Sequence, residues 1–586
     1  MKSLVSVVTI LCIVSLSPTA MAVTFSDVTQ QANLNNYPDC RASAWVDYDR
    51  DGYLDLLIGS EGGVNRLHRN LGDGTFSNVT LEAQIPYRSG IWGVNFADID
   101  NDGFDDLYLS ARAPDTFSAG RNVLLHNSGL GYFDDISDSS GANVPGGGVA
   151  ACFAPFSKGP FVDLFVPNQY YPSREFPFFL SNNGNNVFSD ETGFMGLLYS
   201  DWWDIPIAFD YDNDGRLELF CTKDFHGNSM YDQPYGHTFI NVSDSLHFQT
   251  SCGYGATVGD VNNDGWFDLY ITNWHDYTDK LFLYDSAQRR YRDNTSAWGA
   301  PATTWTSAAH FADFDNDGLP DLFVTGAGTG NTYYHNQSGQ RFTNLTSQAG
   351  LTNYGYNWGA SIGDYDNDGF LDIFVPEYLY GNGGKLYHNN GNNNNWVEFE
   401  LEGTHSNKDA IGAKLVLQGG GYSQMRQVIA GSGFGSQNSL VQHFGVGQDT
   451  IIGNLWVFWP GTGYDIYDSL IVNTRYHIVE GEALAVNGEP VYFPKDFRIV
   501  KTYPNPFNSQ TQIEICVGQP CNLTVDIVDI LGREVKSLLA ERLEPRMLTL
   551  AWDGTDQRGD PISSGIYFCR VTNGIDLNSS RLLLIK

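Results

Sequence analysis

Short apolar runs recur at regular intervals along the first two thirds of the chain. Each run, such as DLFV at 321–324, is only a few residues long and favours a strand over a helix. A polar loop, acidic in most copies, comes directly before each run. The copies of this pattern begin at positions 47, 98, 155, 210, 260, 313 and 364, so successive copies lie 50 to 57 residues apart. A period near fifty predicts four-stranded blades of a β-propeller.

A second repeated segment lies between these loops. FSDVT at 25–29 returns in similar form at 76–80, 133–137, 188–192, 291–295 and 342–346, with a weaker copy at 248–252. The first copy precedes the first acidic loop. We therefore expect it to supply the outer strand of the last blade and to close a seven-bladed ring. An open β-solenoid with the same period is the alternative.

The acidic loops have the spacing of a cation site. In the loop at 313–321, acids stand at positions 1, 3, 5 and 9, and Gly318 stands at position 6, where the chain must turn sharply. Carboxylates this close repel each other unless a cation lies between them. Oxygen ligands from positions 1, 3, 5 and 9, with the main-chain carbonyl of position 7, suit Ca²⁺ better than Zn²⁺ or Cu²⁺. Position 12 is Val324 and not the Glu of an EF-hand, so we expect a calcium loop between two strands.

Six copies keep this spacing, and we expect each to hold one structural Ca²⁺. The copy at 155–163 keeps only its last acid and is expected to lack a metal. The expected metal ligands, including the position 7 residues that offer a carbonyl, are Asp47, Asp49, Asp51, Tyr53, Asp55, Asp98, Asp100, Asp102, Phe104, Asp106, Asp210, Asp212, Asp214, Arg216, Glu218, Asp260, Asn262, Asp264, Trp266, Asp268, Asp313, Asp315, Asp317, Leu319, Asp321, Asp364, Asp366, Asp368, Phe370 and Asp372.

Composition and charge agree with this picture. The 586 residues include 14% aromatic residues and 63 glycines but only 17% charged residues, which fits many short strands and turns. The formal net charge is −35, and six Ca²⁺ would bring it to −23 (−35 + 12). This acidity argues against a nucleic-acid-binding role.

The first 22 residues have the pattern of a signal peptide. Lys2 precedes a short apolar stretch, and Ala20-Met21-Ala22 fits a cleavage site, although a membrane anchor is the alternative. No later segment is long enough to span a bilayer. We therefore expect the protein to be secreted.

The motifs resemble known families. HFADFDNDGLPDLFV at 310–324 and IGDYDNDGFLDIFV at 362–375 resemble FG-GAP/VCBS repeats, the calcium-loop blades of integrin α-chain propellers, over residues 23–390. NKDAIGAKLVL at 407–417 and the segment at 424–447 resemble the ASPIC/UnbV domain over 391–495. Such a domain is expected to be small and β-rich.

The last part of the chain resembles a third family. TYPNPFNSQTQIEI at 502–515 and the ending SSRLLLIK resemble the type IX secretion C-terminal sorting domain, and the alternating strands predict an Ig-like β-sandwich over 498–586. The resemblance implies a bacterial protein that the type IX machinery places on the cell surface or outside the cell; a plain Ig-like spacer is the alternative. The expected fold is thus all-β: a seven-bladed propeller at 23–390, a small β-rich domain at 391–495 and a C-terminal sandwich.

A partner is expected on the face opposite the acidic loops, where long aromatic loops emerge. We expect it to be an extracellular polysaccharide or protein. The expected exposed contacts are Tyr171, His226, Tyr231, Trp274, His275 and Tyr378. The aromatic residues at 92, 202, 203, 305, 356 and 358 open on the same face and either form platforms for a ligand or pack between blades.

Catalysis has little support in the sequence, because it contains no GxSxG, HExxH or P-loop motif. We therefore expect a binding protein and not an enzyme. One alternative is a secreted carbohydrate-active lyase or hydrolase. Its acid or base would come from Asp201, Asp204, Asp224, Asp232, Asp276 or Asp279. The other alternative is a purely structural surface protein.

Overall fold

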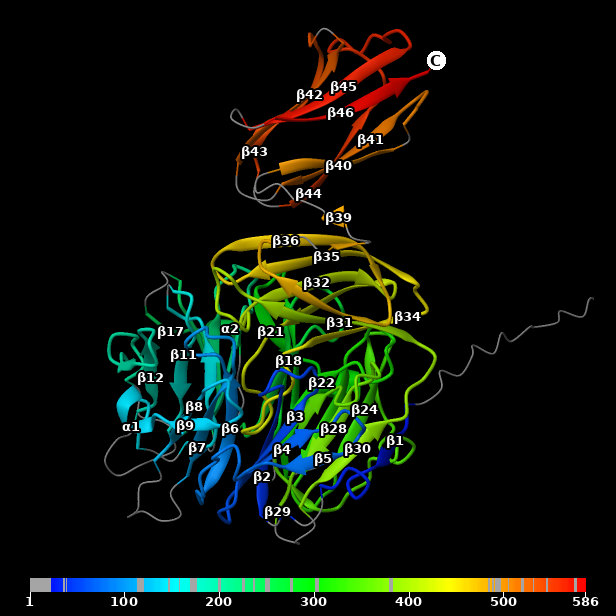
Figure 1. The fold of residues 1–586 in the computed structure, drawn as a ribbon. Helices are drawn as coiled ribbons and strands as arrows, with labels where there is room; N and C mark the ends of the chain where they lie inside the picture. The colour runs from blue at the N-terminus through cyan, green and yellow to red at the C-terminus, as the bar shows by residue number, and fades with distance from the viewer. Residues whose placement is uncertain are drawn as a thin grey trace, which may run out of the picture. The chain divides into compact units, whose positions relative to one another are not determined.

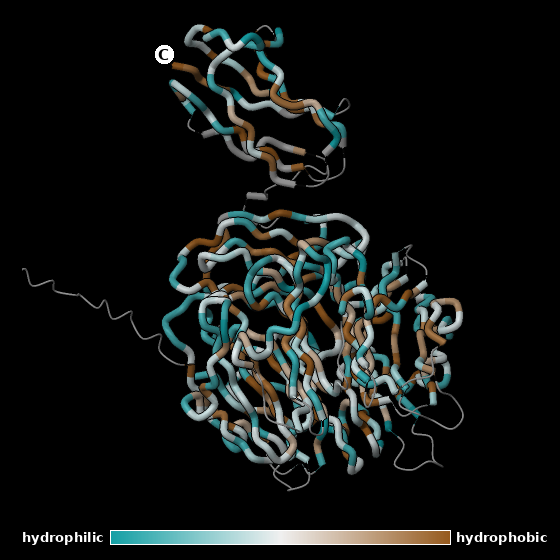
Figure 2. The backbone as a smooth tube through the Cα atoms, turned by 180° about the vertical axis from the view of Figure 1, so that it is seen from behind, coloured by the Kyte–Doolittle hydropathy of each residue, from teal (hydrophilic) through white to brown (hydrophobic). Residues whose placement is uncertain are grey.

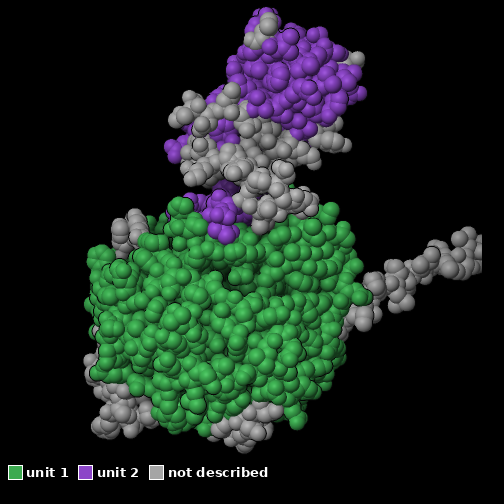
Figure 3. Space-filling model, in the orientation of Figure 1, with its two compact units in different colours: residues 1–455, 468–478 green, residues 456–467, 479–586 purple. Residues whose placement is uncertain are grey.

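The computed structural model describes residues 23–585 in two compact units. The described chain is interrupted at 35–36, 38, 113–120, 146–147, 158, 169–175, 199–201, 224–226, 235–237, 248–252, 275–277, 301–304, 379–382, 483–484, 487–488, 491–496, 504, 518–520, 531, 544–545 and 574–576. Tyr171, His226, His275 and the expected signal peptide therefore lie outside the described residues. One unit comprises Met1–Leu455 and Asp468–Ile478, and the other comprises Trp456–Tyr467 and Val479–Lys586 (Figure 3).

The strands of the repeat region pair into four-stranded antiparallel sheets, as propeller blades do (Figure 1). The first sheet runs in chain order from β2 (Cys40–Val46) through β3 (Asp55–Ser60) and β4 (Arg66–Asn70) to β5 (Phe76–Asn78). The next two sheets are β6 (Ile91–Ala97), β7 (Asp106–Ala111), β8 (Val123–Asn127), β9 (Phe133–Asp135), and then β10 (Cys152–Ala154), β11 (Asp163–Val166), β12 (Phe178–Asn182), β13 (Phe188–Asp190). Two more are β14 (Trp203–Phe209), β15 (Glu218–Lys223), β16 (Ser229–Asp232), β17 (Ile240–Asn241), and then β18 (Ala256–Gly259), β19 (Asp268–Ile271), β20 (Lys280–Asp285), β21 (Arg290–Asp293). The last two described here are β22 (Thr306–Ala312), β23 (Asp321–Gly326), β24 (Thr332–Gln337), β25 (Arg341–Asn344), and then β27 (Ser361–Gly363), β28 (Asp372–Val375), β30 (Lys385–Asn389), β1 (Phe25–Asp27).

The N-terminal strand completes the last sheet, as the repeat phase predicts. β1 pairs antiparallel with β30, with Phe25 opposite Asn389 and Asp27 opposite Tyr387. The weaker copy at 248–252 lies outside the described residues, and the outer strand of its sheet is β17. That strand lies in FINVS at 239–243, which matches FSNVT better than 248–252 does. The prediction that 248–252 is the repeated segment of this sheet is therefore wrong.

Asparagine side chains tie neighbouring sheets together. Asn70 donates from Nδ2 to the Leu54 carbonyl of its own loop and to the Tyr365 carbonyl of the last sheet, at 3.0 and 2.8 Å. Asn127, Asn182, Asn336 and Asn389 repeat this pair of bonds between their own sheet and the preceding one. Because the last sheet is bonded to the first, the repeat region closes on itself and is not an open solenoid.

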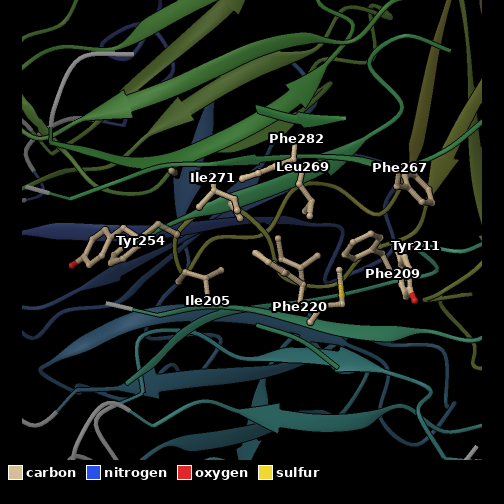
Figure 4. Packing of buried hydrophobic residues seen from close by; sticks show 14 of the residues in the cluster. Ile205, Phe209, Tyr211, Phe220, Tyr254, Phe267, Leu269, Ile271 and Phe282 are labelled. Carbon is tan, nitrogen blue, oxygen red and sulfur yellow. The ribbon is translucent and has the colours of Figure 1, made fainter. Parts of the chain in front are cut away.

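The hydrophobic core lies between neighbouring sheets. Figure 4 shows one cluster in which Ile205 and Phe209 of β14 and Phe220 of β15 face Leu269 of β19 and Phe282 of β20. Each of these side chains is at most 3% exposed. Burial of each contributes about 1.5–3 kcal/mol to the free energy of unfolding. Figure 2 shows the matching pattern, with hydrophobic stretches in the strands and hydrophilic stretches in the loops.

The described helices are single turns, and short sheets follow the repeat region. The helices are α1 (Ser137–Ser140), α2 (Ser243–Leu246) and α3 (Thr295–Trp298), and no described helix is long and apolar enough to cross a bilayer. β26 (Tyr356–Asn357) pairs with β29 (Glu377–Tyr378). After the repeats, β31 (Asn395–Glu402) lies between β34 (Gln442–Gly447) and β37 (Thr474–Val479), and β32 (Lys414–Gly419) pairs with β33 (Tyr422–Gln427). The further strands are β35 (Ile451–Trp459), β36 (Gly463–Ile471), β38 (Ala485–Val486) and β39 (Glu489–Pro490).

The C-terminal strands form two sheets around one core. One sheet has the order β40 (Phe497–Tyr503), β41 (Thr511–Val517), β44 (Arg546–Trp552), and the other has the order β43 (Glu534–Leu543), β42 (Cys521–Asp529), β45 (Gly565–Thr572), β46 (Leu577–Leu584). Ile513 and Trp552 of the first sheet and Ile527 and Val571 of the second belong to one buried cluster. The predicted β-rich C-terminal region is therefore confirmed.

Candidate metal loops and the filled propeller axis

Each acidic loop turns its carboxylates inward. Asp313 accepts the N–H groups of Asp317 and Gly318, at 3.1 and 2.8 Å, and Asp317 accepts the N–H of Leu319 at 2.9 Å. Gly318 has a φ of +92°, which glycine adopts without strain. The other loops repeat the bond from the position 6 glycine to the position 1 acid, at Gly52, Gly103, Gly215, Gly265 and Gly369. The loop is thus held in shape by main-chain donors, with several carboxylates around one point.

The position 9 acid connects each loop to its sheet. Asp55 is fully buried and accepts the N–H of Tyr48 within the loop and the N–H of Asn70 in β4, at 3.2 and 2.8 Å. In the degenerate copy, Asp163 accepts the N–H of Ser157 and of Asn182 in the same way, at 2.7 and 2.9 Å. This explains why 155–163 keeps its last acid: the carboxylate supports the sheet without the rest of the cluster.

The clustered carboxylates are electrostatically unfavourable when no cation is present. Burial, followed by the charges of neighbouring acids, raises the pKa of Asp55 to about 9, that of Asp98 to about 8 and that of Asp317 to about 9. A divalent cation would offset both causes.

Unpartnered oxygens show that the loops fit such a cation. Glu218, which is fully buried, has one carboxylate oxygen, Oε1, without a hydrogen-bond partner. The buried Oδ1 atoms of Asp49, Asp212 and Asp366, all at position 3, also have none. Buried polar atoms usually have a partner. Hard oxygen atoms that converge without one are the ligands that Ca²⁺ prefers.

Sequence reasoning missed one set of residues beside the loops. His335 of β24 lies with its Nδ1 atom 3.4 Å from Asp315 Oδ2 and 3.2 Å from Asp321 Oδ1. His126 and His388 occupy the same place beside their own loops. The signal was available in the sequence, because the pair His-Asn recurs at 126–127, 335–336 and 388–389 in phase with the loops.

The region after the repeats lies against several acidic loops. Asp409 accepts the N–H of Asp98 at 2.6 Å, and Lys414 donates to Asp210 Oδ2 at 2.7 Å. His443 Nε2 lies 2.7 Å from Asn316 Oδ1. The region after the repeats therefore contacts at least three of the acidic loops, while loop residues such as Asp51, Asp214 and Asp368 remain exposed.

A segment of the same region fills the axis of the propeller. Residues 430–438 bond to first strands around the ring: the Ala430 carbonyl accepts the N–H of Phe153 in β10, and the Gly435 carbonyl accepts that of Val94 in β6. Gln437 pairs with Ala44 of β2, and Gly433 pairs with Ala256 of β18. Because first strands meet at the axis of a propeller, this segment occupies the axis. The axis is not an open passage for a ligand here.

Aromatic residues on the face away from the acidic loops pack around Phe434, which belongs to the segment 430–438. The ring of Phe434 stacks on that of Tyr254 with 4.6 Å between centroids, and the Arg41 guanidinium lies 3.8 Å from the ring of Trp92 and 4.0 Å from that of Tyr378. The tryptophans at 92, 203 and 358 are at most 7% exposed, so these pack within the protein.

Several described aromatic residues of this face remain at least partly accessible. Trp305 is 39% exposed and meets the half-buried Trp274 edge to face, with 4.8 Å between centroids. Trp305 also has a φ of +71°, a costly conformation for a bulky residue. Tyr378 is half-buried. Strained, accessible aromatic residues of this kind are typical of binding sites.

Some expected surface residues are buried. Tyr231 was expected to be exposed in a loop after β15, but the structure places it within the strand β16. It is 1% exposed, and its ring stacks on that of Trp203 with 5.3 Å between centroids. Of the acids considered for catalysis, Asp204 and Asp279 are fully buried, and Asp201, Asp224 and Asp276 lie outside the described residues. Asp279 accepts hydrogen bonds from Asn273, Thr306 and Tyr270, which gives it a structural role.

Three family descriptions match the chain. The FG-GAP-like repeat matches residues 47–109, 210–271, 260–324 and 313–375, the ASPIC and UnbV family matches 403–485, and the secretion system C-terminal sorting domain matches 501–586. The resemblances seen in the motifs are therefore confirmed. FG-GAP repeats commonly bind calcium, and none of these families is a family of enzymes.

Curated relatives are similar to this chain over about three quarters of its length. Cartilage acidic protein 1 of Xenopus tropicalis is 25% identical over 495 residues, which cover 76% of this chain and 74% of that protein. The human cartilage acidic protein 1 is 24% identical over 476 residues, which cover 71% and 68%. Among solved structures, an Agrocybe aegerita lectin that recognises non-reducing terminal N-acetylglucosamine aligns with a TM-score of 0.35 and 16% identity, over 53% of this chain and 84% of that chain. No argument rests on that alignment.

The fold and the matches together define a secreted or cell-surface β-propeller protein. It carries FG-GAP-like repeats, an ASPIC/UnbV domain and a sorting domain of the type IX secretion system. The sorting domain implies recognition by the type IX machinery and secretion to the cell surface.

Proposed function

We propose that this protein is a calcium-stabilised binding module of the bacterial cell surface. Its propeller binds an extracellular polysaccharide or protein. The domain bounds of the proposal are 23–390 for the propeller, 391–495 for the ASPIC/UnbV region and 498–586 for the sorting domain, with a signal peptide at 1–22.

The calcium role rests on the acidic loops. Six loops offer four side-chain ligands and one carbonyl each, and the unpartnered oxygen of Glu218 supports a cation at the centre. The ion would neutralise the repulsion of the carboxylates and hold the loop against its two strands. Because the loops join first and second strands around the ring, calcium would stabilise the whole propeller. The role is structural, with no chemical step at the ion.

The ligand role rests on one observation, the accessible pair of Trp305 and Trp274 on the face away from the acidic loops. Flat aromatic rings held rigidly stack on sugar rings and on apolar side chains. The strain of the Trp305 backbone, about 1–3 kcal/mol, persists only if the surrounding structure enforces it, which holds the ring in place.

A glycan array tests the ligand role and also the enzymatic alternative. The full mature chain, from residue 23, is screened with Ca²⁺, and any bound glycan is assayed for released products. Binding that Trp305→Ala abolishes, with no product, supports the proposal, and Tyr354→Ala, which removes another exposed aromatic ring, is the matched control. Product release would favour a lyase or hydrolase. Binding that survives Trp305→Ala would overturn the proposed site.

A further inference from the structure

One register position on the third strand of each sheet faces the acidic loop. In each sheet, the residue after the position 9 acid pairs with a residue of the third strand, and the position in question is the next residue along that strand. In the sheet after the loop at 313–321, Leu322 pairs with Tyr334, and the next residue is His335. The same register selects Arg69, His126, Ser181, Asp232, Leu283, His335 and His388. We call it the facing position. Its side chain differs between loops that are otherwise alike.

Two histidines at the facing position lie at ligand spacing from the loop. His388 Nδ1 is 3.4 Å from Asp366 Oδ2 and 3.3 Å from Asp372 Oδ1, and His335 has nearly the same distances to Asp315 and Asp321. Ligand atoms that share one first-row divalent ion at about 2.0–2.2 Å lie roughly 3.0–3.5 Å apart. The spacing therefore fits one ion between the imidazole and both carboxylates.

An independent observation points to a missing partner at this place. The Oδ1 atom of Asp366 is buried without a hydrogen-bond partner, and the buried Nδ1 atom of His388 makes no well-aligned hydrogen bond although Asp372 Oδ1 lies 3.3 Å away. A buried ring nitrogen and a buried carboxylate oxygen seldom lie together unpartnered. A cation that both atoms bind would satisfy them.

His126 occupies the facing position of a third loop, where it is hydrogen-bonded directly to Asp106 and lies farther from Asp100. Its Nδ1 atom is 2.8 Å from Asp106 Oδ1 and 3.9 Å from Asp100 Oδ2. Asp100, Asp102 and His126 still offer one ligand atom each within 4.8 Å of one another.

The remaining loops lack this nitrogen. At the facing position of the first loop, Arg69 places Nε 2.7 Å from Asp49 Oδ2 and Nη2 2.9 Å from Asp51 Oδ2, so a fixed positive charge already lies against the acids. The loops at 210–218 and 260–268 have Asp232 and Leu283 there, which leaves only oxygen ligands.

Imidazole changes which ion a site prefers. Carboxylate and carbonyl oxygens suit Ca²⁺, whereas imidazole suits transition ions such as Zn²⁺. We propose that the loops at 98–106, 313–321 and 364–372 are mixed histidine–carboxylate sites that bind a divalent transition ion such as Zn²⁺ in preference to Ca²⁺. This inference deepens the proposed metal role of the loops. The all-oxygen loops at 210–218 and 260–268 remain calcium sites.

The test measures retained metal in the full mature chain. The protein is stripped with a chelator, loaded with Zn²⁺, passed through gel filtration in millimolar Ca²⁺, and its zinc is counted by mass spectrometry. We expect one retained Zn²⁺ for each histidine loop. The triple variant His126→Asn, His335→Asn, His388→Asn should retain none, and His247→Asn, which changes an exposed histidine away from the loops, should retain as much as the wild type.

A variant that adds a histidine site tests the inference even if the triple variant does not fold. Leu283→His places imidazole at the facing position of the loop at 260–268, and we expect one additional retained Zn²⁺. Co²⁺ loaded in the same way should give absorption bands that Leu283→His strengthens and the triple variant loses. Zinc that Ca²⁺ displaces from the wild type, or that the triple variant retains while folded, would overturn the inference.

The zinc-retention test can fail without contradicting the proposed calcium role. Ca²⁺ should still raise the melting temperature of the folded triple variant through its all-oxygen loops. Loss of that calcium response in the wild type would contradict the calcium role, whereas zinc retention alone decides the histidine sites.

Discussion

The side-chain nitrogen of Asn367 donates a hydrogen bond of 3.1 Å to the carbonyl oxygen of Gly52, although 315 residues separate them in the chain. This bond joins the last acidic loop to the first. Asn213, Asn263 and Asn316, which also stand at position 4, donate to the position 6 glycine of the next loop in the same way. The acidic loops are thus joined side by side, and the Asn367 bond closes the ring together with the β1–β30 pairing and the bond from Asn70 to the Tyr365 carbonyl.

Replacing Asn367 should weaken this closure. Asn367→Gly removes the bond but keeps a residue that tolerates the φ of +59°. We expect a loss of about 1 kcal/mol in the free energy of unfolding and faster hydrogen exchange in β1 and β30. Asn263→Gly, which removes the equivalent bond to Gly318 within the ring, is the control. Equal exchange in both variants would show that the Asn367 bond has no special role in closure.

Two aspartates should separate the calcium role from the structural role of the loops. Asp163 supports its sheet in a loop without a metal cluster, so Asp163→Ala should lower the free energy of unfolding by about 1–3 kcal/mol. The resulting fall in melting temperature should be the same with Ca²⁺ and with chelator. Asp264→Ala, at position 5 of the all-oxygen loop at 260–268, should remove stability mainly when Ca²⁺ is present. Thermal scans of both variants in both buffers check this, and a loss from Asp264→Ala that ignores calcium would be evidence against calcium binding in that loop.

The segment at the axis should contribute strongly to stability. Phe434 is fully buried and contacts the rings of Trp92, Tyr254 and Trp358. Phe434→Ala should therefore cost about 3–5 kcal/mol, as expected for a large cavity in a packed core. Urea unfolding measures the loss, with the exposed Tyr354→Ala as a control that should change little. A loss below about 1 kcal/mol for Phe434→Ala would contradict the packing of this segment at the axis.

Asp279 should contribute to the pH dependence of stability. Burial raises its pKa from 3.8 to about 7, so the folded protein binds this proton more tightly than the unfolded chain. The group therefore destabilises the fold progressively as the pH rises from about 4 to about 7, and the penalty is largest above pH 7. Asp279→Asn should flatten this part of the profile by a few kcal/mol. Parallel profiles of the free energy of unfolding for the variant and the wild type would contradict the raised pKa.

Much of the propeller could be predicted from the sequence, because each loop is a local motif. Spacing and glycine position are enough to identify a loop such as 313–321, and the phase of FSDVT identifies the closing strand. The prediction at 248–252 was wrong although the better match, FINVS at 239–243, was present in the sequence and contains the outer strand β17.

The contacts on the loop face and the filled axis could not be predicted, because they depend on contacts between distant parts of the chain. Nothing local to AGSGFGSQN at 430–438 indicates that first strands around the ring bind it. The burial of Tyr231 was missed for a similar reason: its position in β16 depends on the pairing with Leu219. The His-Asn pairs at 126–127, 335–336 and 388–389 recur in phase with the loops, but only the register of the third strands shows that these histidines face the acids.

The most direct test of the account is a calcium titration of the full mature protein after removal of metal with a chelator. Saturating the structural loops should raise the melting temperature steadily, because an ion that binds only the folded state adds about 2.7 kcal/mol per site at a hundredfold excess over its Kd. A melting temperature that does not change between chelator and millimolar Ca²⁺ would contradict the claim that calcium stabilises this propeller.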